Sequence, residues 1–178
     1  MGSVAEKVLR GTSNPLLLVR ATEGTNITGD VALKSIIVPL DGSELAESVL
    51  PSVVELAKQL DLEVILFRAY NVPYGIYEGA GAYAVDMERL IADIEAEVQQ
   101  YLKEKCNTLR KAGLEKASYA SREGFSADEI IKYGRKTPDK LIAMCTHGRS
   151  GVTRWLLGSV TEAVVRYSGD PVLVVRAG

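Results

Sequence analysis

Short apolar segments alternate with amphipathic segments along this chain, and that alternation is the strongest constraint on its fold. Most of the apolar segments lack the polar alternation of a half-exposed strand, which is typical of strands buried on both faces of a parallel sheet. Helices that connect parallel strands cross over in a right-handed sense and cover both faces. The sequence therefore predicts an α/β fold with a five-stranded open parallel sheet, with strands at residues 35–40, 63–70, 117–122, 140–146 and 171–176.

Apolar residues spaced three and four apart predict the helices between these strands. Ser126, followed three residues later by Glu129, resembles a capping box at the start of one of them. Residues 71–84 contain three tyrosines and are predicted as a loop long enough to cover a ligand. The helices are expected at residues 45–60, 87–109, 126–136 and 160–167.

Composition and charge disfavour several classes of protein. A chain of 178 residues with 47% hydrophobic and 25% charged residues is typical of a soluble globular domain. Its net charge of −2 favours neither nucleic acid nor an anionic membrane, and no apolar run approaches the roughly 20 residues of a membrane span. Cys106 and Cys145 form no disulfide framework, which favours a reducing cytoplasm. A single histidine and two cysteines disfavour a transition-metal site.

A glycine-rich run at residues 146–161 lies between an apolar strand and a helix. Backbone N–H groups in such a loop and at a helix amino end can converge on phosphate. Ligands of open parallel sheets bind at the carboxyl ends of the strands, where the strand order reverses. Asp41 follows the first predicted strand, and the glycine run follows the fourth. If these strands are neighbours, both turns face one crevice, so a nucleotide is the leading candidate ligand.

The start of the chain repeats its end. Residues 2–21 and 158–177 align without gaps and are identical at 11 of 20 positions, so both should be a helix followed by a strand. We interpret residues 1–30 as the tail of a preceding repeat plus a linker, and residues 31–178 as the main domain; a native fragment is the alternative. The apolar strand from Pro15 to Arg20 should add to a sheet edge. We expect antiparallel pairing with the strand from Pro171 to Arg176, in one chain or by exchange in a homodimer.

Four segments together resemble the universal stress protein family. They are VPLDGS at 38–43, MCTHGRSG at 144–151, LLGSV at 156–160 and PVLVV at 171–175. The resemblance extends from Ser35 to Arg176 and implies a Rossmann-like fold of the adenine nucleotide alpha hydrolase type, together with a role in stress response.

The ATP-binding branch of that family is similar in its pattern Gly-x2-Gly-x9-Gly-Ser/Thr. Gly148, Gly158 and Ser159 match this pattern, whereas Cys145 stands at the position of the first glycine. Cysteine fits there if the backbone is extended and is costly if that residue needs a positive φ.

The resemblance also implies which residues bind ATP or another adenine nucleotide. Asp41 would meet the ribose hydroxyls, Pro39 and Leu40 would line the nucleoside pocket, and the Ala69 backbone would bind the adenine edge. Mg²⁺ would bridge phosphate oxygens, with Asp41 as the nearby carboxylate. From the residue types alone, Ser159 is also expected to cap the last helix. The candidates near the phosphates are Cys145, His147, Gly148, Arg149, Gly151, Gly158, Ser159, Val160 and Thr161.

Simpler interpretations of these residues stay open. Asp41 can serve as a turn and cap residue, His147 has no identifiable catalytic partner, and Arg149 can be a solvated surface charge. The leading hypothesis is a cytoplasmic stress-response protein that acts as a nucleotide-dependent interaction module. We expect slow hydrolysis at most, because no lysine follows the last glycine of the motif. The alternatives are an interaction protein without nucleotide and a slow ATPase.

Overall fold

The computed structural model describes residues 7–8, 12, 14–19, 32–72, 84–146 and 157–176. Within these residues, one sheet has six strands in the order β1-β6-β5-β2-β3-β4. The five predicted strands are present and parallel to one another, and β1 adds a sixth, antiparallel strand at one edge. The strands are β1 Leu16–Leu18, β2 Ser35–Pro39, β3 Glu63–Tyr70, β4 Ala117–Glu123, β5 Lys140–Cys145 and β6 Val172–Val175.

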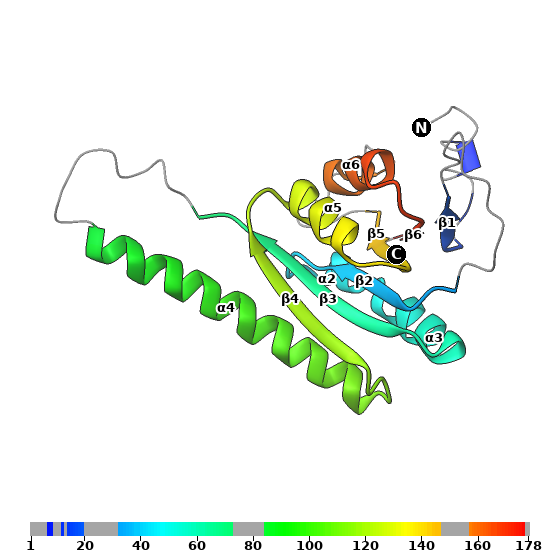
Figure 1. Cartoon of the computed structure of the whole chain (residues 1–178), viewed down its shortest axis with the longest axis horizontal. Coiled ribbons are helices and arrows are strands. Elements are labelled where there is room, and N and C mark those ends of the chain that lie inside the picture. Colours follow the sequence, from blue (N-terminus) through cyan, green and yellow to red (C-terminus); the bar gives the residue numbers. More distant parts are fainter. Residues whose placement is uncertain are drawn as a thin grey trace.

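Helices cover both faces of the sheet, as predicted (Figure 1). Packing on one face involves α3 and α4, whose buried residues join those of β2 and β3 in one apolar cluster. The other face is covered by α5 and α6, which contribute to a second cluster. The helices are α2 Glu44–Glu47, α3 Leu50–Leu60, α4 Ala84–Lys111, α5 Ser126–Lys136 and α6 Ser159–Tyr167.

The strand order reverses beside β2. The chain passes from β2 to β3 and β4 on one side, then returns to place β5 and β6 on the other side, so β2 pairs with both β3 and β5. The carboxyl ends of β2 and β5 are therefore the point where connections diverge and a crevice opens. The condition that the strands before Asp41 and before the glycine run are neighbours is therefore met.

The single helix predicted at residues 45–60 is wrong, because the segment forms two helices, α2 and α3. Pro51 explains the break, since it lacks an N–H and its ring would clash with the carbonyl of residue 47 in a continuous helix. In the structure Pro51 lies in the first turn of α3, where no intrahelical donor is needed. The break leaves Ser48 between the helices, and its hydroxyl donates to the Leu45 carbonyl at 2.7 Å.

The predicted capping box at Ser126 is also wrong. The N-cap of α5 is Phe125, no side chain caps the helix, and Ser126 is already helical. Gly124 has φ of 142°, and a Cβ there would lie 2.8 Å from the Glu129 side chain. Glu129 instead bonds Lys132 at 2.7 Å. The helix itself still begins at Ser126, the first residue of the predicted range, so only the assignment of Ser126 as its cap is wrong.

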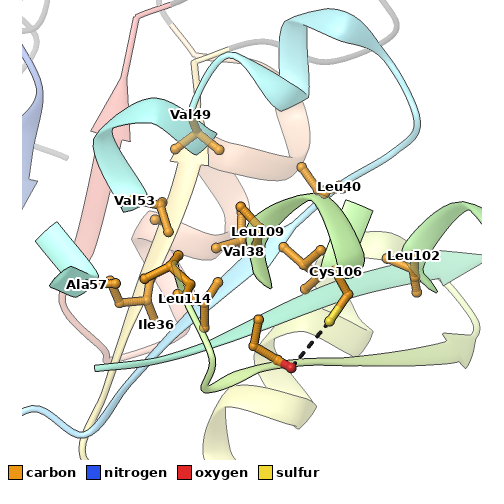
Figure 2. Packing of buried hydrophobic residues seen from close by; sticks show 14 of the residues in the cluster. Ile36, Val38, Leu40, Val49, Val53, Ala57, Leu102, Cys106, Leu109 and Leu114 are labelled. Carbon is orange, nitrogen blue, oxygen red and sulfur yellow. Dashed lines mark hydrogen bonds between the residues drawn. The ribbon is translucent and has the colours of Figure 1, made fainter. Parts of the chain in front are cut away.

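The larger apolar cluster lies between the sheet and the layer of α3 and α4 (Figure 2). Ile36 and Val38 of β2 face Leu102 of α4, and all three side chains are fully buried. The Cys106 thiol donates to the Ala117 carbonyl at 3.3 Å, and burial raises the pKa of this thiol. Cys106 is therefore a core residue that ties α4 to β4.

Strand β1 pairs with β6 in a symmetric register. Leu16 lies opposite Val174, Leu17 opposite Leu173, and Leu18 opposite Val172. Leu17 and Leu173 occupy equivalent positions of the sequence repeat, so a local two-fold axis passes through this pair. Antiparallel addition of the N-terminal strand is confirmed within one chain. Its predicted helix lies outside the described residues, except for the helical residues Lys7 and Val8.

Candidate functional site

A pocket of about 590 Å³ lies at the carboxyl ends of β2, β3 and β5 and at the amino end of α6. Four predicted site residues, His147, Gly148, Arg149 and Gly151, lie outside the described residues. The structure brings the other nine together in the wall of this pocket: Pro39, Leu40, Asp41, Ala69, Cys145, Gly158, Ser159, Val160 and Thr161.

Asp41 has a structural role in the turn between β2 and α2. Its Oδ1 accepts hydrogen bonds from the Ser43 amide at 2.9 Å and from the Ser43 hydroxyl at 2.6 Å. Ser43 in turn caps α2 by accepting from the Ala46 amide at 3.2 Å. Gly42 has φ of 88°, a conformation that costs most side chains about 1 kcal/mol or more. Asp41 is therefore a turn residue, and the turn holds its carboxylate at the pocket.

Cys145 ends β5, and its backbone is not in the left-handed region. Among the described residues other than glycine, only Asp61 and Asp139 have a positive φ. The Cys145 carbonyl accepts from the Thr161 hydroxyl at 3.0 Å, and its Sγ lies 3.2 Å from the Ser48 hydroxyl oxygen. Because the Ser48 hydrogen is donated to Leu45, the thiol is the donor to Ser48. Cysteine therefore fits this position without backbone strain.

The amino end of α6 faces the pocket without a side-chain cap. The N-cap is Gly158, in extended conformation, so the expectation that Ser159 caps this helix is wrong. Gly158 is held in place by its amide, which donates to the Thr146 carbonyl at 2.7 Å. Ser159, Val160 and Thr161 form the first turn, where backbone N–H groups have no intrahelical acceptor. This helix end is suited to an anion.

Arg68 is a pocket residue that the sequence analysis missed. It lies on β3, is 8% exposed, and places its guanidinium carbon 4.9 Å from the centre of the Tyr101 ring on α4. The Tyr101 hydroxyl donates to Glu47 Oε1 at 2.8 Å, and Lys105 contacts Glu47 Oε2 at 2.5 Å. An arginine inside an otherwise apolar strand was a signal that could have identified this residue.

The Tyr101 hydroxyl makes the stability of the fold depend on pH. Burial first, and then the hydrogen bond to Glu47, raise the pKa of Tyr101 well above its usual value of 10. The folded state therefore holds this proton more tightly than the unfolded state. The resulting stabilisation is complete below about pH 10 and is lost as the pH rises through the folded pKa.

We expect a Tyr101→Phe variant to lose less stability than the wild type between about pH 9 and 11. Urea unfolding across this range measures the effect as a smaller slope of free energy of unfolding against pH. Tyr167→Phe is the matched control, because Tyr167 is 65% exposed on α6. Equal slopes for wild type and Tyr101→Phe would contradict the assignment.

The fold and the pocket define an open-sheet α/β protein with a ligand crevice where the strand order reverses. A model of the universal stress protein family matches residues 32–176, and the chain belongs to this family. Universal stress protein MJ0531 from Methanocaldococcus jannaschii is 32% identical, over 83% of this chain and 85% of that protein.

Two solved structures share the fold. Universal stress protein UspA from Lactobacillus plantarum has a TM-score of 0.69 and 19% identity, covering 80% of this chain and 97% of that chain. A universal stress protein in complex with cAMP has a TM-score of 0.61 and 21% identity, covering 83% and 99%.

The described part of the chain contains neither a metal-ligand cluster nor a membrane span. No group of three or more His, Cys, Asp and Glu side chains there is arranged to hold a metal ion. The helices in this part of the chain are all too short or too polar to cross a membrane.

Proposed function

We propose that this protein binds an adenine nucleotide, with ATP and Mg²⁺ as the leading candidate, in the pocket at the strand ends. The observation that carries the proposal is the meeting of Asp41 with the uncapped amino end of α6 in one pocket. Its volume of about 590 Å³ is within the range of ordinary small-molecule sites. The relative that was solved with cAMP supports an adenine nucleotide as the class of ligand.

The lining residues give each part of the nucleotide a partner. The phosphates bind the N–H groups of the first turn of α6, which carry the positive end of the helix dipole. The ribose hydroxyls bind the Asp41 carboxylate, and the adenine edge binds the backbone of Ala69 at the end of β3. Pro39 and Leu40 pack against the nucleoside. His147, Gly148, Arg149 and Gly151 complete the phosphate site in this proposal.

Mg²⁺ enters this proposal with the phosphates. Magnesium keeps several waters and is usually bound through one or two carboxylates together with substrate phosphates. Asp41 offers one carboxylate at the pocket, and its Oδ1 already accepts two hydrogen bonds from Ser43. A single carboxylate of this kind fits a metal that arrives with ATP.

We propose a regulatory role in stress response within the cytoplasm rather than a catalytic one. The β6 edge, Val172–Val175, is the surface through which copies of the chain assemble, and β1 covers it within one chain. A homodimer forms when β1 is displaced or exchanged between two copies. In this proposal β1 belongs to the unit of residues 1–30, and residues 31–178 form the nucleotide-binding domain.

We expect Asp41→Asn to weaken ATP binding by roughly 10-fold or more, because the ribose loses hydrogen bonds to a charged acceptor. An asparagine oxygen still accepts from Ser43, so the turn is kept. Isothermal titration calorimetry of the full chain with ATP, with and without Mg²⁺, measures the change.

Asp61→Asn is the matched control for charge. Asp61 ends α3 in a left-handed conformation that asparagine tolerates, and it precedes β3, at the opposite end of the sheet from the pocket. ATP affinity of this control should stay within about twofold of the wild type. Wild-type protein that binds no adenine nucleotide would contradict the proposal and favour an interaction protein without nucleotide.

A further inference from the structure

The pocket extends over both faces of the sheet at the end of β3. Phe67 lies on the face of α5, where its ring centre is 4.7 Å from that of Tyr133. Arg68 is the next residue and faces α4, where it contacts Tyr101. Both line the pocket, and so do Ile94 and Val98 of α4. The pocket therefore has one side toward α5 and α6 and another side toward α4.

Arg68 is a buried cation on the α4 side. It is 8% exposed, and the only partner that the described part of the chain offers it is the Tyr101 ring. Tyr101 and Lys105 already share the Glu47 carboxylate. An arginine stays protonated in proteins, and burying its charge without an anion is costly. The described structure thus holds a fixed positive charge in the pocket wall without an ion pair.

Asp41 and Glu97 also line the pocket, but neither carboxylate forms an ion pair with Arg68 in the described structure. Asp41 accepts two hydrogen bonds from Ser43, and Glu97 lies on the exposed face of α4. The cation–π contact with Tyr101, at 4.9 Å, holds the guanidinium beside that ring. A planar guanidinium held in this way is suited to two parallel hydrogen bonds from a phosphate or carboxylate.

We propose that Arg68 binds an anionic group on the α4 side of the pocket, separate from the phosphate site at the amino end of α6. The two sites are distinct because α6 packs on the opposite face of the sheet. The anion is either a second phosphate on the ribose of the bound nucleotide or a free phosphate bound beside it. The first source rests on the proposed nucleotide function, and the second does not.

The position of Asp41 favours the ribose as the carrier of this group. Asp41 is close enough to Tyr101 to contribute, as the smallest of several causes, to the raised pKa of its hydroxyl. In the proposed nucleotide site the ribose lies at Asp41, so the proposal requires that one ribose hydroxyl bind Asp41 and that the other carry the phosphate that Arg68 binds. A nearby arginine is also how dinucleotide-binding folds accept a ribose phosphate.

The test compares ADP with its 2′-phospho and 3′-phospho derivatives by calorimetry on the full chain. We expect the wild type to prefer one derivative over ADP by about tenfold, and Arg68→Gln to lose that preference. Arg68→Lys keeps the positive charge but lacks the planar guanidinium, so this variant should retain part of the preference. Arg122→Gln is the matched control, since Arg122 is exposed on β4 and is not part of the pocket wall.

A second measurement uses inorganic phosphate alone at constant ionic strength. A rise in melting temperature in the wild type and in Arg122→Gln, but not in Arg68→Gln, would show that Arg68 binds free phosphate, even if no nucleotide binds. That result would retain the Arg68 site while the nucleotide function fails. Conversely, if ADP binds and Arg68→Gln and Arg68→Lys change neither the nucleotide preference nor the phosphate response, the Arg68 proposal is overturned and the nucleotide function stands.

Discussion

A Phe67→Ala variant is expected to lose about 3–5 kcal/mol of the free energy of unfolding. The Phe67 side chain is fully buried on β3, a strand paired on both sides, and its ring packs against Tyr133 of α5. Removing it takes away apolar contacts and leaves a cavity that the paired strands cannot close. Such a loss is a large share of the roughly 5–15 kcal/mol that stabilises an ordinary domain.

Urea or guanidinium unfolding followed by circular dichroism measures this loss. The chain has only two phenylalanines, and the other one provides the control. Phe125 is 73% exposed, so Phe125→Ala should change the free energy of unfolding by no more than about 0.5 kcal/mol. A loss below about 1 kcal/mol in Phe67→Ala would show that the second cluster does not depend on this ring.

Removal of residues 1–20 is expected to strengthen self-association by on the order of 10²-fold. The deletion takes away β1 and leaves β6 with unpaired backbone groups and apolar side chains at an open edge. A tethered strand competes with a second copy at an effective concentration in the millimolar range, so its loss favours pairing between chains. Sedimentation velocity over a series of protein concentrations measures the change.

The symmetric register provides a specific control for this deletion. In a two-fold pairing of two β6 strands, Leu173 of one copy would face Leu173 of the other, as it faces Leu17 in the full chain. Leu173→Lys in the shortened protein places two like charges opposite each other and should restore the monomer. A shortened protein that remains monomeric at every concentration would mean that β6 is not an assembly surface.

Much of the sheet could be predicted because its strands are apolar and bounded by turn residues. β3 begins and ends at the predicted residues, whereas the pairing of β2 with β5 was left as a condition by the sequence and is supplied by the structure. The details at the helix starts were harder to predict than the strands, because each depends on the backbone at one residue. Pro51 divided a continuous apolar pattern, and α5 begins at Ser126 as expected but with Phe125 rather than Ser126 as its N-cap.

The candidate site was predictable where a motif carried it and was missed where packing created it. Asp41, Cys145 and Gly158 line one pocket as their motifs suggested. Whether cysteine fits at residue 145 depended on a backbone angle that no sequence pattern gives. Arg68 was missed because its importance comes from its burial beside Tyr101. The two residues lie on β3 and α4, which are distant in sequence.

The last four residues of β3 have a consequence for how occupancy of the pocket could be sensed. Phe67 through Tyr70 all line the pocket, although successive side chains point to opposite faces of the sheet. A bound molecule would therefore lie across the end of the sheet and contact the helical layers on both of its faces. Binding or release of this molecule would change the packing of both helical layers together. The outer surfaces of the two layers, although far apart, would then respond to the same binding event.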